Sequence, residues 1–560
     1  MNGYLKSIMD IMRRDKAKGP MEYIPELTWM MFVRLLDEKE EKQKEEAEIT
    51  GDDFKNSLEY PFRWQDYAWK DVENIFVVDN KNLNIERKLL EEIVYKSETV
   101  LDWKGNRTYF KQDFKNSEIY KNFKKEIDEV LKNAETINTA VWWDKRVELK
   151  ENWKEVLDFV NEELIPFLKS FVDNPKASSK QKLISLIFDH IEKTKISAEV
   201  NLLEIFERIH HISDNKISGE NFFAMSQIYE SLLLKMGDKN SDWGQFFTPR
   251  SVIKTMVTVI DPKIESSFYD PCCGTGGFLA ETYKYLYSNH KLTTKQLEFL
   301  SEKAFWWKDN SDTVFAITLA NLVVHNISMP HISNENTLTG HITNNDLFKW
   351  APAQFDYIFT NPPFWGKESK ELIAGTDFAY KTNNTQLLFI QHVIDKLKTG
   401  WECAIVLDEW VLFRTNENAF VKTKELLMTE CDLHTIVSLP AWVFTSTWAW
   451  VKTNLLFFKK GKKTKKTWYY DMSDLKVNKW NPLTYNKFGE FLELYKTKKE
   501  TKKSWFVSFK EIEKKNFDIK AVNPNIKEEI IRPTEEIVDK LIEDISKVKE
   551  MMEEIKRSLK

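Results

Sequence analysis

Apolar residues follow two different patterns along the chain, and the first covers its N-terminal third. In ELTWMMFVRLLDEKEEKQKEE (26–46) and KQKLISLIFDHIEKT (180–194), apolar positions recur at helical spacing with charged residues on the opposite face. This spacing predicts a helical N-terminal domain over residues 1–190. We find no group of residues typical of catalysis there, so we expect the domain to act as a scaffold or to bind a partner.

Beyond residue 200, short apolar runs alternate with helical segments. SSFYD (266–270), KAFWWKD (303–309) and ECAIVLD (402–408) have the length of buried strands, and stretches with helical spacing separate them. This alternation predicts an α/β, Rossmann-like domain over 191–490, with a mostly parallel sheet and helices on both faces. Residues 491–560 end in a charged helix whose apolar stripe has heptad-like spacing. We expect this C-terminal helix to contact a partner subunit, because the stripe needs a surface to bury against.

A glycine turn follows the first predicted strand of this domain. In DPCCGTGGF (270–278), glycines allow a sharp turn into a helix N-terminus, which suits a nucleotide-type ligand. The dinucleotide fingerprint GxGxxG is absent, and the carboxylate of Asp270 would repel a pyrophosphate. Asp270 instead favours an amino-bearing ligand such as S-adenosylmethionine. The next strand ends at Asp309, which either holds ribose hydroxyls or is a solvated strand-end aspartate.

NPPF (361–364) ends another predicted strand, QFDYIFT. The side-chain oxygen of Asn361 and the carbonyl of Pro362 can accept both hydrogens of one exocyclic amine, which turns the nitrogen lone pair outward. Phe364 offers a flat face for a planar base. The motif therefore indicates methylation of a planar amino group, and a purely structural loop is the alternative.

Together, GQFFTPR (244–250), DPCCGTGGF and NPPF resemble the modification subunit of type I restriction–modification systems, which are N6-adenine DNA methyltransferases. The resemblance covers most of residues 1–490. GQFFTPR is its discriminating motif, because protein-glutamine and RNA-guanine methyltransferases also carry NPPF or NPPY but lack GQFFTPR.

The resemblance implies S-adenosylmethionine as cofactor and assigns the site residues to four groups. The cofactor would be covered by Gln245, Phe246, Phe247, Thr248, Pro249 and Arg250; its methionine part would be cradled by Asp270, Pro271, Gly274, Thr275, Gly276 and Gly277; its ribose and adenine would contact Asp309 and Asn336; and the flipped target adenine would be held by Asn361, Pro362, Pro363 and Phe364. No metal ligand set is implied.

The resemblance also implies double-stranded DNA as substrate, a specificity (S) subunit that reads it, a restriction (R) subunit that cleaves it, and two modification subunits per complex. The net charge of −5 agrees with delegated DNA reading. The absence of a long apolar run, a signal peptide or a CxxC pair predicts a cytoplasmic chain without a membrane span. Two alternatives stay open: a methyltransferase of protein glutamine or RNA, and a non-catalytic assembly subunit.

The chain holds only 16 glycines but 20 tryptophans. Usual glycine usage predicts about 39 glycines at this length. The family pattern has glycine, at predicted turns or beside ligand sites, where this chain has Trp307, Trp365, Trp401, Trp410, Trp442, Trp448 and Trp450, and Trp243 looks similar. We hypothesise that the gene uses UGA for glycine and was translated with UGA as tryptophan. A diverged or decaying protein, with real tryptophans, is the alternative.

Two of these indoles bear directly on the predicted site: at 307 beside the ribose and at 365 in the base pocket. Three other tryptophans, Trp29, Trp64 and Trp468, lie in apolar or strand contexts where an aromatic residue is expected. Trp306 is not assigned to either group.

Overall fold

The computed structural model describes most of the chain in segments. These are 2–15, 20–51, 53–68, 147–148, 153–214, 248–329, 331–340, 348, 351–364, 366–444, 452–478 and 481–525, with single positions at 546, 549 and 552. The predicted C-terminal helix, within 491–560, therefore falls largely outside the described residues.

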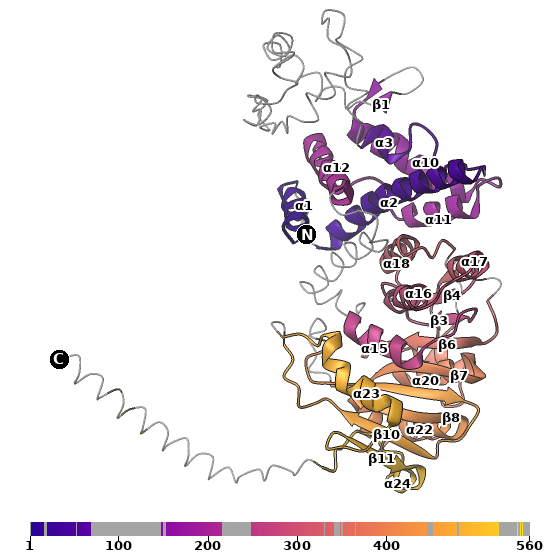
Figure 1. Ribbon diagram of the computed structural model, residues 1–560, viewed down its shortest axis with the longest axis vertical. Coiled ribbons are helices and arrows are strands. Elements are labelled where there is room, and N and C mark those ends of the chain that lie inside the picture. Colours follow the sequence, from indigo (N-terminus) through magenta and orange to yellow (C-terminus); the bar gives the residue numbers. More distant parts are fainter. Residues whose placement is uncertain are drawn as a thin grey trace, which may run out of the picture.

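The N-terminal part is a layer of helices, as the sequence predicts (indigo and purple in Figure 1). The main helices are α1 (Asn2–Arg14), α2 (Pro20–Thr50), α3 (Trp64–Tyr67), α9 (Val156–Phe159), α10 (Ile165–Lys169), α11 (Ser179–Phe188) and α12 (Glu199–Asp214). Two short helices, η2 (Val160–Leu164) and η3 (Ser170–Val172), flank α10, and β1 (Val147–Glu148) pairs with β2 (Trp153–Lys154).

Aromatic rings hold these helices together from segments far apart in the sequence. Trp29 and Trp64 both contact Phe206, with ring centroids 6.2 and 5.0 Å away. Both indoles are fully buried, as expected for tryptophans on apolar helix faces. Burial of such rings contributes more than any surface contact to a helical layer of this size.

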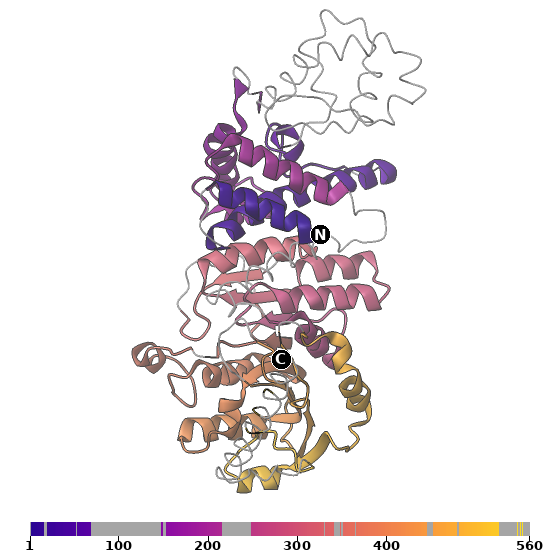
Figure 2. The same cartoon turned by 90° about the vertical axis from the view of Figure 1, so that its left-hand side faces the viewer.

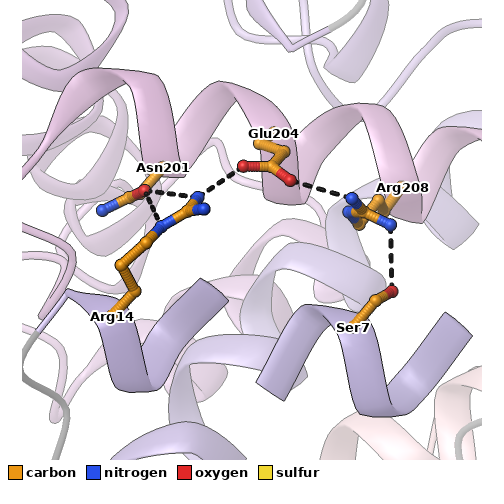
Figure 3. Close-up of polar contacts among 5 residues, drawn as sticks. All are labelled: Ser7, Arg14, Asn201, Glu204 and Arg208. Atoms are coloured by element: carbon orange, nitrogen blue, oxygen red, sulfur yellow. Dashed lines mark hydrogen bonds and ion pairs between the residues drawn. The ribbon is translucent and has the colours of Figure 1, made fainter. Parts of the chain in front are cut away.

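Helix α1 is tied to α12 by a polar network at the edge of this core (Figure 3). Arg14 donates to Asn201 and forms an ion pair with Glu204, which also accepts from Arg208 at 2.8 Å. Arg208 in turn donates to Ser7 at 3.0 Å. Two arginines therefore share one carboxylate, which fixes the position of α1 along α12.

The remaining described residues form a nine-stranded sheet with helices on both faces, so the predicted α/β class is confirmed. Its order is β11-β10-β8-β9-β7-β6-β3-β4-β5. The strands are β3 (Phe268–Asp270), β4 (Phe305–Asp309), β5 (His331–Asn334), β6 (Phe355–Thr360), β7 (Leu397–Asp408), β8 (Cys431–Ser438), β9 (Thr453–Lys460), β10 (Lys466–Asp471) and β11 (Ser504–Ser508). Neighbours pair in parallel except around β9 and between β10 and β11.

The sheet is larger than the sequence predicts. β5 and β10 were not expected, and β11 lies beyond the predicted domain end at residue 490. The helices are α15 (Arg250–Ile260), α16 (Gly277–Asn289), α17 (Thr294–Glu302), α18 (Asp312–Val324), α19 (Lys370–Ala374), α20 (Thr385–Lys396), α21 (Glu409–Phe413), α22 (Asn418–Glu430), α23 (Gly489–Thr497) and α24 (Phe509–Lys514), with the 3-10 turn η5 (Tyr485–Phe488).

Helix α18 lies between the sheet domain and the N-terminal helices. It contacts α2 and α11 on one side and α16 on the other, and both views show the N-terminal layer stacked on it (Figures 1 and 2). Its sequence is apolar almost all round, as expected for a helix buried on several faces. The two domains thus share part of one core.

We predict that Trp29→Ala destabilises the N-terminal layer by about 3–5 kcal/mol, because it removes a fully buried indole from the ring cluster. Urea denaturation followed by circular dichroism measures the loss. Trp410→Ala is the matched control: its indole is 52% exposed, so we expect a change within about 0.5 kcal/mol. Equal losses in the two variants contradict this account of the core.

Candidate active site

A cavity of about 300 Å³ opens where β3, β4, β5 and β6 end at one edge of the sheet. The carboxyl ends of parallel strands meet at the same edge, so the loops that follow them converge. The wall includes Pro271, Asp309, Asn336, Asn361 and Pro363, all of them predicted site residues. Residues spread over ninety positions of sequence therefore line one cavity of ligand size.

The glycine turn forms one wall, and its backbone requires glycine. Gly274 and Gly276 have φ values of +54° and +79°, in the left-handed region. A Cβ on Gly276 would lie 3.0 Å from side-chain atoms of both Leu322 and Thr318. The turn is thus packed directly against α18, and the helix α16 begins immediately after it.

Side chains of α18 hold the carbonyls of this turn. Thr318 donates its hydroxyl to the Gly274 carbonyl, and Asn321 donates to the Thr275 carbonyl at 2.7 Å. Both side chains are buried. Neither residue was predicted from the sequence, although two polar positions three apart in the apolar segment SDTVFAITLANLVVHN were a usable signal.

The GQFFTPR segment is only partly described. Gln245, Phe246 and Phe247 lie outside the described residues. Pro249 precedes α15, and Arg250 donates to the carbonyl of Gly277 at 2.6 Å. Arg250 is not among the described residues of the cavity wall, so it supports the glycine turn from outside where the sequence suggested a cover over the ligand.

Two aspartates end the strands β3 and β4; Asp309 lines the cavity, and Asp270 lies next to its wall residue Pro271. Asp270 is fully buried; one of its carboxylate oxygens accepts from the Thr360 hydroxyl at 2.8 Å, while the other has no partner among the described residues. Burial raises the pKa of Asp270 to about 7. Asp309 accepts from the backbone N–H groups of Gly274 and Ser311, and burial raises its pKa to about 6.

The loop after β5 brings the carboxylate of Glu335, which was not predicted from the sequence, to the cavity wall. Glu335 forms an ion pair with Lys308 and leaves one buried oxygen without a partner among the described residues. Next to it, the Asn336 amide accepts from Leu338 N at 3.0 Å and donates to Glu368 at 3.1 Å. Asn336 therefore joins the β5 loop to the loop that follows NPPF.

In the NPPF motif, the nitrogen and the oxygen of the Asn361 side-chain amide have different surroundings. Its nitrogen donates to the Thr248 hydroxyl at 2.9 Å, and its oxygen is buried without a partner among the described residues. Pro362 is buried. Phe364 is half-buried and packs edge-to-face on Phe444, with ring centroids 5.4 Å apart.

Eight tryptophans of this chain, Trp243 included, are assigned to positions where the family has glycine. The structure describes four of them. Trp442 lies in a turn with φ +69° and is 43% exposed, as the glycine hypothesis expects. Trp401 lies within β7 and Trp410 within α21, so the predicted turns at these two positions are wrong. The predicted position of the 307 indole is also wrong: it packs in the core on Phe315, because its neighbour Trp306 takes the opposite face of β4. Trp243, Trp365, Trp448 and Trp450 fall outside the described residues.

Comparison with known proteins shows which family the chain matches. The model of the N-6 DNA methylase family matches residues 222–531, and that of the HsdM N-terminal domain matches residues 1–138. The methylase subunit of the Escherichia coli type I restriction enzyme EcoEI is 26% identical over 555 residues, which is 96% of this chain and 93% of that protein. The StySPI methylase subunit of Salmonella potsdam is 31% identical over 320 residues, or 55% of this chain and 58% of that one.

Solved structures agree over the full length. A chain from a study of complex assembly and conformational transition in the type I restriction–modification system is 28% identical, with a TM-score of 0.65 over 100% of this chain and 98% of that one. A modification subunit assigned to a type I restriction enzyme of Vibrio vulnificus YJ016 is 26% identical, with a TM-score of 0.68 over 94% and 96% of the two chains.

We predict that affinity for a cationic ligand such as S-adenosylmethionine rises with pH between about 5.5 and 7.5. Asp270 and Asp309 have raised pKa values, so both are partly protonated in the lower half of this range and attract a cation only once ionised. For the same reason the ligand-free protein loses stability as pH rises from about 4 to 7, where the folded state holds more protons than the unfolded state.

Isothermal titration calorimetry across this range measures the effect. Asp270→Asn should flatten much of the pH dependence, whereas Asp395→Asn, at an exposed carboxylate outside the cavity, should leave it intact. A pH profile unchanged in Asp270→Asn contradicts the role of this carboxylate.

We predict that Trp442→Gly stabilises the printed chain by about 1–2 kcal/mol, because it relieves a left-handed backbone at a residue with a Cβ. Thermal unfolding measures the change. Trp468→Gly, at a fully buried strand position, is the control and should cost about 3–5 kcal/mol. Destabilisation by Trp442→Gly as well would show that tryptophan is native there.

The eight-glycine chain, which carries glycine at 243, 307, 365, 401, 410, 442, 448 and 450, extends this test to function. We expect it to bind S-adenosylmethionine more tightly than the printed chain, because tryptophans at 243 and 365 would directly flank GQFFTPR and NPPF, the two motifs whose Thr248 and Asn361 line the cavity. The indoles at 307, 401 and 410 lie away from the cavity wall and are not expected to contribute to this difference. Equal affinity defeats the hypothesis, and peptide mass spectrometry of the host protein at 307 or 450 decides it independently.

Proposed function

The chain belongs to the N-6 DNA methylase family, and we propose that its cavity transfers a methyl group from S-adenosylmethionine to N6 of an adenine flipped out of duplex DNA. Its resemblance to type I methylase subunits runs through nearly the whole length, so the chain is a modification subunit of that type. One observation carries the site assignment: a buried amide oxygen without a described partner lies in the NPPF motif, at the wall of a cavity that the glycine turn also lines.

The residues of the cavity fit S-adenosylmethionine. Gly274, which has no side chain, lines the cavity together with the carboxylates Asp309 and Glu335, and the buried Asp270 immediately precedes the wall residues Pro271 and Cys272. Two of these carboxylates have a buried oxygen without a described partner, so a cation or hydroxyl donor would satisfy them. When bound there, the sulfonium group of S-adenosylmethionine supplies an electrophilic methyl group.

In the reaction, the chain's own residues hold the target adenine and orient its N6 toward the methyl group. The Asn361 amide oxygen and the Pro362 carbonyl accept the two N6 hydrogens, so the nitrogen lone pair points out of the plane of the base. Phe364, set on Phe444, limits where the base can lie. Flipping costs a few kcal/mol, and alignment of the reacting atoms supplies most of the acceleration. The extra proton of the methylated amine leaves to water.

For the other groups of the site we propose roles that follow their placement. Gly274, Thr275, Gly276 and Gly277 cradle the methionine part, beside Pro271 and above Asp270. Asp309 keeps lone pairs for ribose hydroxyls because each carboxylate oxygen can accept twice. The family resemblance assigns residues 245–247, with Thr248, to the cover over the cofactor; Pro249 and Arg250 connect Thr248 to α15 and the glycine turn.

We also propose the assembly implied by the type I relatives: an S subunit that reads the DNA, an R subunit that cleaves it, and two modification subunits per complex. A net charge of −5 supports delegated DNA reading. The helical region 1–190 and the charged segment after 490 are the proposed contact regions. No described helix has the length and apolar character needed to cross a membrane. A subunit that modifies host DNA works in the cytoplasm, and we place the chain there.

We predict that Asn361→Ala lowers methylation of duplex adenine at least about a hundredfold while S-adenosylmethionine affinity changes less than about threefold. The variant removes an acceptor for N6 but leaves the glycine turn intact. The eight-glycine chain, reconstituted with the specificity subunit of its system, is assayed for N6-methyladenine by mass spectrometry. Asn289→Ala, an exposed asparagine, is the control.

The same assay separates the rival functions. Transfer to RNA or to protein glutamine, without transfer to duplex adenine, would replace DNA as the substrate. Cofactor binding without any transfer, in the presence of the partner subunits, would leave a non-catalytic assembly subunit.

A further inference from the structure

The side chain of Thr248 reaches across the site to the NPPF motif. Its hydroxyl oxygen lies 2.9 Å from the amide nitrogen of Asn361, 113 positions later in the chain. Both residues line the cavity. The family resemblance assigns Thr248 to the cover over the cofactor, and its contact with the Asn361 amide does not follow from the sequence.

This contact anchors the Asn361 side chain while its oxygen faces the other way. The Thr248 hydroxyl could also donate to a reversed amide, so the orientation is selected jointly by Thr248, which can accept from the amide nitrogen, and by the donor hydrogens of the target amine. An amide nitrogen and an amide oxygen have nearly the same size, so shape alone does not select between the two orientations. With the nitrogen bound to Thr248, the oxygen takes the buried position without a partner. In the reversed orientation, two amide hydrogens would confront the donor hydrogens of an adenine N6 group and repel it.

The position of Thr248 is itself fixed by its neighbours. Pro249 sets the backbone ahead of α15, and its carbonyl accepts from the backbone N–H groups of Val252 and Ile253 at 2.9 and 3.1 Å. Threonine is β-branched and has few side-chain rotamers, so its hydroxyl is presented with little loss of entropy. The acceptor for Asn361 is thus in place before the base arrives.

We propose that Thr248 is a positioning residue of the methyl transfer, which holds the Asn361 amide with its oxygen toward the target amine. The proposal rests on the proposed function of the NPPF motif. It assigns to GQFFTPR a second role, in recognition of the base, beyond closure over the cofactor. Thr248 acts through Asn361 and touches neither transferred atom.

The first test compares Thr248→Val with Thr248→Ser in the eight-glycine chain, or in the printed chain if the two bind cofactor equally. Valine keeps the shape but cannot accept, so we expect kcat to fall about tenfold to a hundredfold at saturating S-adenosylmethionine, with cofactor Kd unchanged. Serine should restore kcat to within about threefold. Thr258→Val, on α15 and bonded to Tyr485, controls for loss of a hydroxyl. A raised cofactor Kd with unchanged kcat overturns the proposal and leaves Thr248 a cofactor residue.

A double-mutant cycle separates positioning from a general structural effect. If Thr248 acts through Asn361, Thr248→Val should change residual activity less than about twofold in an Asn361→Ala background. An undiminished loss in that background contradicts the proposal, since it places the effect elsewhere.

A final measurement does not depend on methylation, so failure of the proposed function is distinguishable from failure of this inference. The side-chain amide resonance of Asn361 is assigned in ¹⁵N-asparagine-labelled protein by its loss in Asn361→Asp. We expect its hydrogens to exchange at least about tenfold faster in Thr248→Val than in the parent or in Thr248→Ser. Equal exchange in all three overturns the inference whatever the activity; absent methylation with the expected exchange counts against the proposed function alone.

Discussion

The glycine turn between β3 and α16 is the constraint on which the cavity depends. Its left-handed glycines free the backbone for close approach of a ligand, but they also leave carbonyls that no regular helix or strand satisfies. Thr318 and Asn321 of α18 donate to two of them, and Asp309 accepts from the N–H of Gly274. A turn that is intrinsically pliable is therefore held rigid by side chains from two neighbouring elements.

Helix α18 holds the glycine turn with one face and packs against the N-terminal domain with the other. It is covered by α2 and α11 of the N-terminal layer, so the helix that positions the glycine turn is also part of the domain interface (Figure 1). Packed interiors transmit small displacements with little loss. The N-terminal layer thus lies one helix away from the cofactor site.

The site also shows how polar groups are divided between structure and chemistry. Buried amides and carboxylates in a folded protein are normally paired. Here the nitrogen of Asn361 is paired with Thr248, while its oxygen and one oxygen each of Asp270 and Glu335 have no partner among the described residues. Other buried polar atoms share this property, among them the oxygen of Asn321, but these three belong to the NPPF motif and to the strand ends around the cavity, where a ligand could pair with them.

Sequence by itself determined the alternation of strands and helices, the glycine turn, NPPF and the order of the motifs, because these depend on local spacing and on residues with special backbone properties. It did not determine β5, β10 and β11, whose short or irregular runs become strands only by pairing at the sheet edge. Nor did it place the Trp307 indole in the core, bring Glu335 to the cavity, or join Thr248 to Asn361. Those contacts connect positions far apart in the chain, and only the convergence of parallel strand ends at one edge brings them within bonding distance.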